Sequence, residues 1–97
     1  MAIVQLKPKA VKFIKTLPPK HKRQVKDHIL SLQQEPLPQD ARPLIGYENY
    51  LRTDIGEYRV IYRYEQNKDL ITVVLVGKRN DAAIYRIAKR TLKGRQS

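Results

Sequence analysis

Two arginines and one tyrosine in the C-terminal half of the chain are of types suited to chemistry on phosphate. Arg59 lies within the run EYRVIYRYE, Arg79 follows the apolar run LITVVLVGK, and Tyr85 comes six positions after Arg79. A guanidinium group binds phosphate through a planar fork of N–H donors and keeps its charge at neutral pH. A pocket that gathers these three side chains would therefore suit a reaction on a phosphodiester.

Cleavage of RNA by its own 2′-hydroxyl needs three contributions from a protein. A base must take the proton of the hydroxyl, the phosphorane must be stabilised, and the departing 5′-oxygen must be protonated. Arginine suits the second task, but its pKa above about 12 makes it a poor acid or base near neutral pH. Asp54 could be the base if its neighbours keep it ionised. A slow enzyme that relies on orientation and electrostatic stabilisation also fits these residues.

The charge of the chain indicates a polyanionic partner. Its 97 residues include 20 lysines and arginines against 9 aspartates and glutamates, which gives a formal net charge of +11. A chain this basic repels itself and attracts nucleic acid or an acidic protein. A generic cationic surface is the alternative interpretation.

Length and composition predict one soluble domain over residues 1–97. The chain has no cysteine, which excludes disulfides and cysteine catalysis. The longest apolar run, Leu70 to Val76, is far shorter than the roughly 20 residues of a membrane helix. Since residues 1–6 lack the apolar segment of a signal peptide, we expect a cytoplasmic protein.

Hydrophobic periodicity predicts a strand and two helices in the first half of the chain. Residues 3–6 indicate a short strand, and Pro8 stands where a helix start accepts proline. Apolar side chains recur at helical spacing over 9–17 and again over 20–34. Two consecutive prolines separate these segments, so we expect a helical hairpin. The stretch from 36 to 46 has no period of its own and is typical of a loop.

A strand with two different faces is predicted over residues 58–65. Tyrosine and valine alternate there with a largely basic set of side chains. Tyr58, Tyr62 and Tyr64 share a face with Val60, which favours core packing over stacking on a nucleic acid. The opposite, basic face is where we expect a ligand to lie.

Shorter signals complete the predicted fold. A strand begins near Tyr50, residues 66–69 form a hairpin turn, and the apolar run after the turn is typical of a central strand. Asn80 or Asp81 can cap a last helix over 82–93. The order βαα-βββ-α predicts an α+β domain, in which an antiparallel sheet packs on the N-terminal helical hairpin and a helix ends the chain.

The two histidines are candidates for acid–base catalysis. His21 and His28 lie seven positions apart and so share one face of the second predicted helix. Lysines and an arginine surround them, which favours a solvated face rather than a catalytic role. Two histidines with scattered acids also form no ligand cluster, so we expect no metal and no other cofactor.

The element order, together with EYRVIYR and VGKRNDAAIYR, resembles the RelE toxins of bacterial and archaeal toxin–antitoxin pairs, in the RelE/ParE superfamily. The resemblance covers nearly the whole chain. RelE toxins are ribosome-dependent endoribonucleases that cut messenger RNA in the ribosomal A site, and a cognate antitoxin silences them. The resemblance therefore implies a RelE-like fold and a prokaryotic toxin that inhibits translation.

The resemblance also implies roles for individual residues. Arg59 matches the phosphate-binding arginine of the third strand. Arg79 matches the arginine proposed as general acid or charge stabiliser, and Tyr85 matches the tyrosine thought to stack on or orient the substrate nucleotide. The second strand of the family often carries two basic residues two positions apart, one of them the proposed general base. Arg52 matches the first of these positions, and Asp54 stands at the second.

Further cations and partners follow from the same resemblance. Basic side chains close to this catalytic set are expected to bind RNA: Arg63, Lys78 and Arg86. The expected partners are the ribosome with its messenger RNA and a cognate antitoxin in a hetero-oligomer. A segment of the antitoxin that folds on binding would place acids against the arginines.

Two other functions are open on the same fold. A ParE-type toxin inhibits DNA gyrase by protein contact and performs no RNA chemistry. A catalytically weak member would only bind an antitoxin or RNA, and Asp54 in place of a basic residue makes that hypothesis possible.

Overall fold

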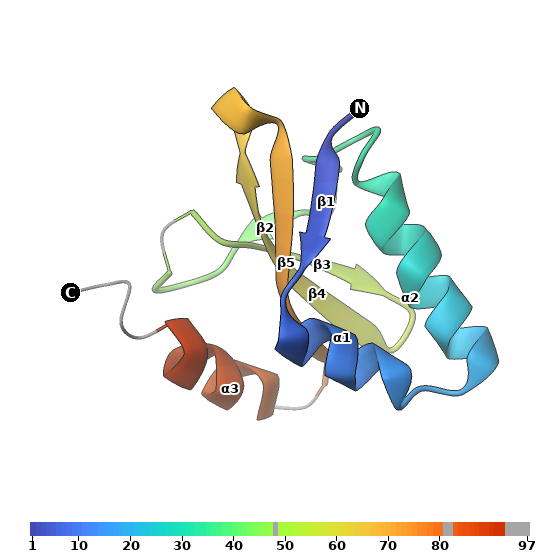
Figure 1. Ribbon diagram of the computed structural model, residues 1–97. Helices are drawn as coiled ribbons and strands as arrows, with labels where there is room; N and C mark the ends of the chain where they lie inside the picture. The colour runs from blue at the N-terminus through green and yellow to red at the C-terminus, as the bar shows by residue number, and fades with distance from the viewer. Residues whose placement is uncertain (48, 81–82, 93–97) are drawn as a thin grey trace.

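The computed structural model describes residues 1–47, 49–80 and 83–92, and it has the predicted α+β fold (Figure 1). Along the chain the elements are β1 (Ile3–Leu6), α1 (Pro8–Lys15), α2 (Pro19–Ser31), β2 (Arg42–Pro43), β3 (Leu51–Ile55), β4 (Tyr58–Glu65), β5 (Leu70–Lys78) and α3 (Ala83–Leu92). A single 3₁₀ turn, η1 (Gln66–Lys68), joins β4 to β5. The predicted order is confirmed, and β2 is added within the stretch predicted as a loop.

The strands form one sheet in the order β1-β5-β4-β3-β2. The predicted antiparallel pairing is confirmed for β3, β4 and β5, and β2 extends it by two residues. β1 lies at the other edge and runs parallel to β5, with Ile3 opposite Leu70 (Figure 1). The sheet is therefore mixed. Two parallel neighbours need a long crossover connection between them, and the helices and strands between β1 and β5 provide it.

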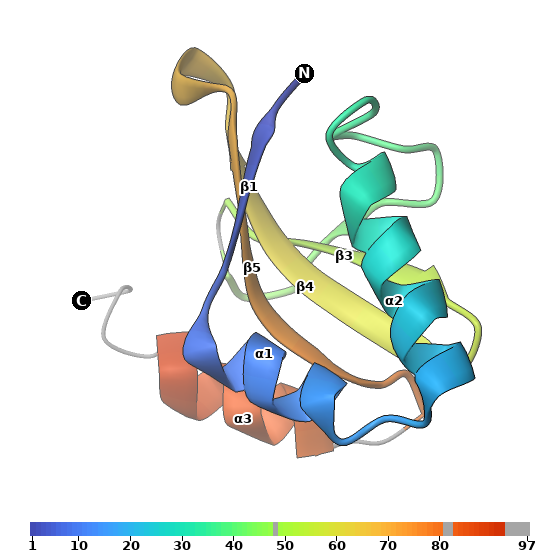
Figure 2. The ribbon, with the colours of Figure 1, turned by 45° about the vertical axis from the view of Figure 1, so that its right-hand side comes forward.

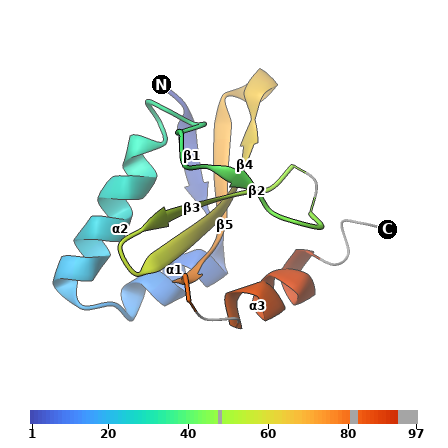
Figure 3. The same cartoon turned by 180° about the vertical axis from the view of Figure 1, so that it is seen from behind.

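Helices cover both faces of the sheet. α1 and α2 bury Ala10, Ile14 and Val25 in one hydrophobic cluster, in which α1 packs on β5 and α2 on β3 (Figure 2). α3 buries Ile84 and Ala88 in a second cluster. Seen from behind, α3 lies nearer the viewer and α1 lies beyond the sheet (Figure 3). The face of the sheet that α3 covers only in part is available for a site.

A β-bulge in β5 turns two consecutive side chains to the same face of the sheet. Ile61 of β4 is opposite Leu75, and the next residue, Tyr62, is opposite Val73, so Val74 is an extra residue in β5. Val73 packs in the cluster of α1 and α2, whereas Val74 and Leu75 both pack in the cluster of α3. The bulge thus lets one strand bury two consecutive side chains beneath α3.

The tyrosines of β4 pack as predicted. Tyr58 and Tyr62 are buried in the cluster of α1 and α2, and Tyr64 packs against it. The hydroxyl of Tyr62 donates to the carbonyl of Pro36 at 2.7 Å, and burial raises its pKa to about 12. The rings of Tyr58 and Tyr62 thus belong to the core rather than to a stacking surface for nucleic acid, whereas Tyr64 is partly exposed.

The ends of the helices differ from the predicted boundaries. α2 ends at Ser31 instead of position 34, and Gln33 beyond it exchanges two hydrogen bonds with the backbone of Ala2. Asn80 lies in the turn before α3, whereas Asp81, the other predicted cap, and the predicted helix end at position 93 lie outside the described residues. No helix in the described part of the chain is long and apolar enough to cross a lipid bilayer.

Candidate functional site

A bidentate ion pair joins β3 to β4. Asp54 and Arg59 are opposite each other in the antiparallel register. The Nε of Arg59 donates to Oδ1 of Asp54 at 2.7 Å, and Nη2 donates to Oδ2 at 3.1 Å. A two-residue loop joins the strands, and its first residue, Gly56, has a φ of 57°. Residues with a side chain are strained in this backbone conformation. This tight turn sets the register that makes the pair possible.

Tyr85 of α3 completes this arrangement from outside the sheet. Nη1 of Arg59 donates to the hydroxyl of Tyr85, and the guanidinium carbon lies 5.7 Å from the centre of the ring. Close packing holds α3 in place, because a Cβ on Gly77 would lie 3.0 Å from the side chain of Ile84. Tyr85 is 39% exposed, so it lies at the surface of the site and not in the core.

Several arginines act on the Asp54 carboxylate. The hydrogen bonds from Arg59 lower the pKa of Asp54, the charges of Arg59, Arg52 and Arg79 lower it further, and partial burial opposes them. The same pair raises the pKa of Arg59. The backbone N–H of Arg79 donates to the carbonyl of Glu57 at 2.9 Å, which ties the end of β5 to the turn between β3 and β4. Asp54 is therefore an ionised carboxylate among three guanidinium groups.

Four residues singled out in the sequence thus come together. Arg52, Arg59, Arg79 and Tyr85 all act on Asp54 or on its partner. Asp54, which departs from the basic residue that the family often has, lies at the centre of this group. We call these five residues the Asp54 cluster.

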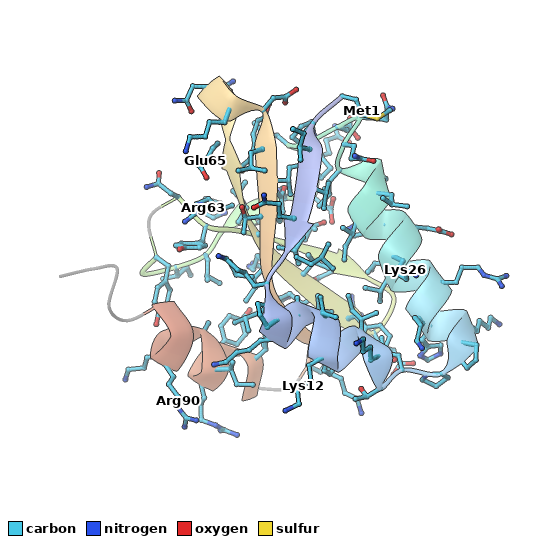
Figure 4. The ribbon with its side chains drawn as sticks, in the orientation of Figure 1. Met1, Lys12, Lys26, Arg63, Glu65 and Arg90 are labelled. Carbon is cyan, nitrogen blue, oxygen red and sulfur yellow. The ribbon has the colours of Figure 1, made fainter. Side chains whose placement is uncertain are left out.

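The other expected RNA-binding cations have different positions. Lys78 is exposed at the end of β5, where it is opposite Tyr58, and Arg86 is exposed on α3 directly after Tyr85. Arg63 lies toward the turn between β4 and β5, beside Glu65 (Figure 4). Arg63 is therefore separate from the Asp54 cluster, although both use the same strand.

The predicted solvated face for the two histidines is wrong. Nδ1 of His21 lies 2.5 Å from the hydroxyl of Tyr58, and Nε2 of His28 lies 3.4 Å from Oγ1 of Thr53, so both rings face the sheet. Burial lowers the pKa of His28. The shared stripe with Val25 could have shown this, because positions 21, 25 and 28 follow each other on one helix face.

The contacts of Thr53 were not predicted. Thr53 stands between Arg52 and Asp54 in the sequence, but its side chain is buried on the opposite face of β3. There Oγ1 donates to Oδ2 of Asp40 at 2.7 Å. This hydrogen bond lowers the pKa of Asp40. Asp40, Thr53 and His28 thus support β3 from behind the Asp54 cluster. Only the alternation of the strand indicated that Thr53 points inward.

Solved structures similar to this chain are toxins and toxin–antitoxin complexes. The archaeal RelE–RelB complex from Pyrococcus horikoshii is 28% identical, with a TM-score of 0.72, and the match covers 84% of this chain and 98% of that chain. The RelBE2 toxin–antitoxin complex from Mycobacterium tuberculosis is 25% identical, with a TM-score of 0.71, over 80% and 98%. The isolated Escherichia coli RelE toxin, at 19% identity, has a TM-score of 0.71 over 95% and 99%, and shows the fold alone.

The family comparison agrees with the structures. No curated protein sequence matches the chain. Residues 4–83 match the family described as the ParE toxin of type II toxin–antitoxin system, parDE. Together with the likeness to RelE structures, this match means that the chain belongs to the ParE toxin family of type II toxin–antitoxin systems, as a RelE-type toxin of the RelE/ParE superfamily.

Proposed function

We propose that this toxin is a metal-independent endoribonuclease that cleaves messenger RNA in the ribosomal A site and so inhibits translation. The Asp54 cluster carries this proposal, because it combines an ionised carboxylate, three guanidinium groups and an exposed tyrosine. The carboxylate can act as the base and the guanidinium groups can stabilise the phosphorane, which are two of the three contributions that cleavage by a 2′-hydroxyl requires. The tyrosine ring can hold the substrate nucleotide by stacking.

In the proposed reaction Asp54 takes the proton of the 2′-hydroxyl. The 2′-oxygen then forms a bond to the adjacent phosphorus, and the bond from phosphorus to the 5′-oxygen breaks. The products are a 2′,3′-cyclic phosphate and a 5′-hydroxyl, whose proton comes from water or from Arg79. Because the arginines keep the pKa of Asp54 low, Asp54 is a weak base, which agrees with an enzyme that depends mainly on positioning.

The arginines stabilise the phosphorane in this proposal. Three of the five N–H groups of Arg59 donate to Asp54 and Tyr85, which leaves two for a phosphate oxygen. Arg52 and Arg79 add positive charge that acts at the same carboxylate. Fixed donors of this kind need no reorganisation during the reaction, and each is typically worth about 10²- to 10³-fold in rate.

The remaining partners follow from charge. Arg63, Lys78 and Arg86 would bind phosphates outside the scissile position. A cognate antitoxin would silence the toxin in a hetero-oligomer, which the RelE–RelB and RelBE2 complexes among its structural neighbours support. A toxin that meets ribosomes would act in the prokaryotic cytoplasm.

A gyrase-inhibiting toxin is the second candidate function, because the matching family is described as ParE. In that case the Asp54 cluster would be a structural ion pair, and the toxic surface would lie elsewhere. Toxicity would then survive loss of Arg79 and of the Tyr85 hydroxyl, with signs of DNA damage and intact messages.

Inducible expression with mapping of messenger RNA 5′ ends on translating ribosomes tests the proposal. The wild type should produce new cleavage sites within reading frames, and the Arg59→Ala, Arg79→Ala double variant should not. Arg23→Ala, Lys26→Ala is a matched control, because it removes the same charge from α2 on the far side of the sheet (Figure 4). Equal cleavage by the test and control variants would overturn the nuclease assignment. Growth arrest by both the wild type and the Arg59→Ala, Arg79→Ala double variant, with intact messages, would favour the gyrase hypothesis.

A further inference from the structure

A pocket lined by tyrosines lies beyond the Asp54 cluster. It is open, has a volume of about 710 Å³, and is formed by the loop after β2 and the last residues of β4. Tyr47, Tyr50 and Tyr64 provide its aromatic wall, and the other lining residues are uncharged among those that the structure describes. Tyr47 and Tyr64 are partly exposed, whereas Tyr50 is buried. The pocket therefore offers a flat aromatic surface.

Arg63 lies beside this pocket, in contact with the lining residue Tyr50. Its guanidinium carbon lies 5.8 Å from the centre of the Tyr50 ring, and Nη1 lies 3.4 Å from the hydroxyl of Tyr50. Nη2 lies 3.4 Å from the carboxylate of Glu65. Both contacts exceed the usual range of about 2.7–3.2 Å. Nε is buried and has no hydrogen-bond partner within the described part of the chain.

These contacts make Arg63 easy to redirect toward a ligand. A partly exposed pair held at this length contributes little to stability. Lys68 also lies 3.4 Å from Glu65, so the carboxylate would keep a cation if Arg63 moved away. Arg63 can therefore bind an anion without leaving an unpaired charge behind.

We propose that Arg63 and the tyrosine-lined pocket form a second nucleotide subsite, in which single-stranded RNA places a base against Tyr47 and Tyr64 and a phosphate on Arg63. This inference rests on the proposed function, because the bound strand is the one cleaved at the Asp54 cluster. Arg59 and Arg63 are four residues apart on β4, about 13 Å along the strand, so a short RNA reaches both.

The chemistry of the wall favours RNA over an acidic peptide as the occupant. Each of the four bases presents a flat face that stacks on tyrosine, and the phosphate of the nucleotide carries a negative charge that pairs with Arg63. An acidic peptide would engage Arg63 but would leave the aromatic wall unused. A base with its phosphate uses both parts of the subsite.

Binding of an RNA that cannot be cleaved tests the role of Arg63. The probe is a fluorescein-labelled oligouridine of eight 2′-O-methyl nucleotides, measured by fluorescence anisotropy with the isolated toxin at constant salt. Arg63→Gln should weaken binding about tenfold, because one charge-assisted contact is lost. Arg23→Gln, which removes the same charge from α2, should change it by about twofold or less. Equal losses in the two variants would overturn the subsite.

Abasic probes test the pocket itself. In a series with one abasic position at a time, the wild type should lose about tenfold at one position, where stacking is removed. Tyr47→Leu should bind the intact probe as weakly as the wild type binds that abasic probe, and it should be insensitive to the abasic position. A wild type indifferent to every abasic position would overturn the base pocket and assign it to a protein partner.

The two proposals can fail separately. If messages are cleaved on ribosomes but Arg63→Gln and Arg23→Gln bind RNA equally, only the second subsite is wrong. If RNA binding depends on Arg63 and on the base while no cleavage occurs, the nuclease assignment is wrong and the subsite stands.

Discussion

The two arginines of β4 that point toward the α3 side of the sheet are held in opposite ways. Arg59 forms two hydrogen bonds with Asp54, at 2.7 and 3.1 Å, and a third with Tyr85. Arg63, four residues later, has contacts of 3.4 Å with Tyr50 and Glu65. The side chains are 14% and 23% exposed, so burial alone does not explain the difference.

The difference comes from what lies opposite each arginine. Arg59 meets a carboxylate in register on β3, whereas the pairing of β3 with β4 stops at Leu51 opposite Tyr62, one position short of Arg63. A side chain fixed by short bonds can position a reacting group, and one held by long contacts can adjust to a ligand. One strand thus provides a rigid site and an adaptable one.

The largest expected effect separates the two arginines by their kinetics. Arg59→Ala should lower the rate of ribosome-dependent cleavage by about 10²- to 10³-fold, because a fixed phosphate ligand is lost. Arg63→Ala should lower it by about tenfold or less, mainly through weaker RNA binding. Single-turnover cleavage on programmed ribosomes measures both. Equal rates for the two variants would remove the functional distinction.

Asp54→Asn removes the negative charge of the partner of Arg59 and keeps the size and shape of its side chain. If Asp54 is the base, cleavage should fall by about 10²-fold. Because the pKa of Asp54 lies below its usual value of 3.8, the ionised carboxylate stabilises the fold above that pH, and this stability is lost as the pH falls through the lowered pKa. The variant should therefore unfold with a weaker pH dependence below about pH 4. Full cleavage by Asp54→Asn would exclude Asp54 as the base.

Gly77→Ala should move Tyr85 away from Arg59, so that Arg59 is held less firmly, as Arg63 is. A Cβ at this position would lie 3.0 Å from the side chain of Ile84, so α3 must shift. Overpacking of this kind costs about 1–3 kcal/mol in the free energy of unfolding. Urea denaturation measures the loss, and cleavage by the folded variant should fall as well. Unchanged stability would mean that Ile84 adapts without moving α3.

The smallest effect tests the support behind β3. Burial lowers the pKa of His28 below 6.5, so the folded state favours the neutral ring. The unfolded chain binds the proton more readily, and stability should therefore decline as the pH falls through about 6.5. In His28→Gln this part of the decline should disappear, as measured by thermal unfolding between pH 7.5 and 5.5. A variant that keeps the full wild-type slope would exclude His28 as the cause.

Much of the fold could be predicted because its signals are local. The period of two over residues 58–65, the helical spacing around Pro8 and the order of elements all follow from neighbouring residues. Residue resemblance to RelE toxins also pointed to Arg52, Arg59, Arg79 and Tyr85, and the structure gathers these around Asp54.

The incorrect and missing predictions concern contacts between distant segments. His28 was interpreted as solvated, because its neighbours in sequence are basic, yet Thr53 lies against it from β3. Neither the parallel pairing of β1 with β5 nor the contact of Tyr50 with Arg63 leaves a periodic signal in the chain.

The sequence by itself determined the types of element, the α+β class and the basic face of β4, because side-chain alternation and turn residues act over a few positions. Only the tertiary structure decided which charges pair. The register of β3 against β4 places Asp54 opposite Arg59, and because β3 begins only at Leu51, Arg63 lies beside Tyr50. Pairing of charges depends on distances of a few ångströms across strands, which spacing along the chain does not specify.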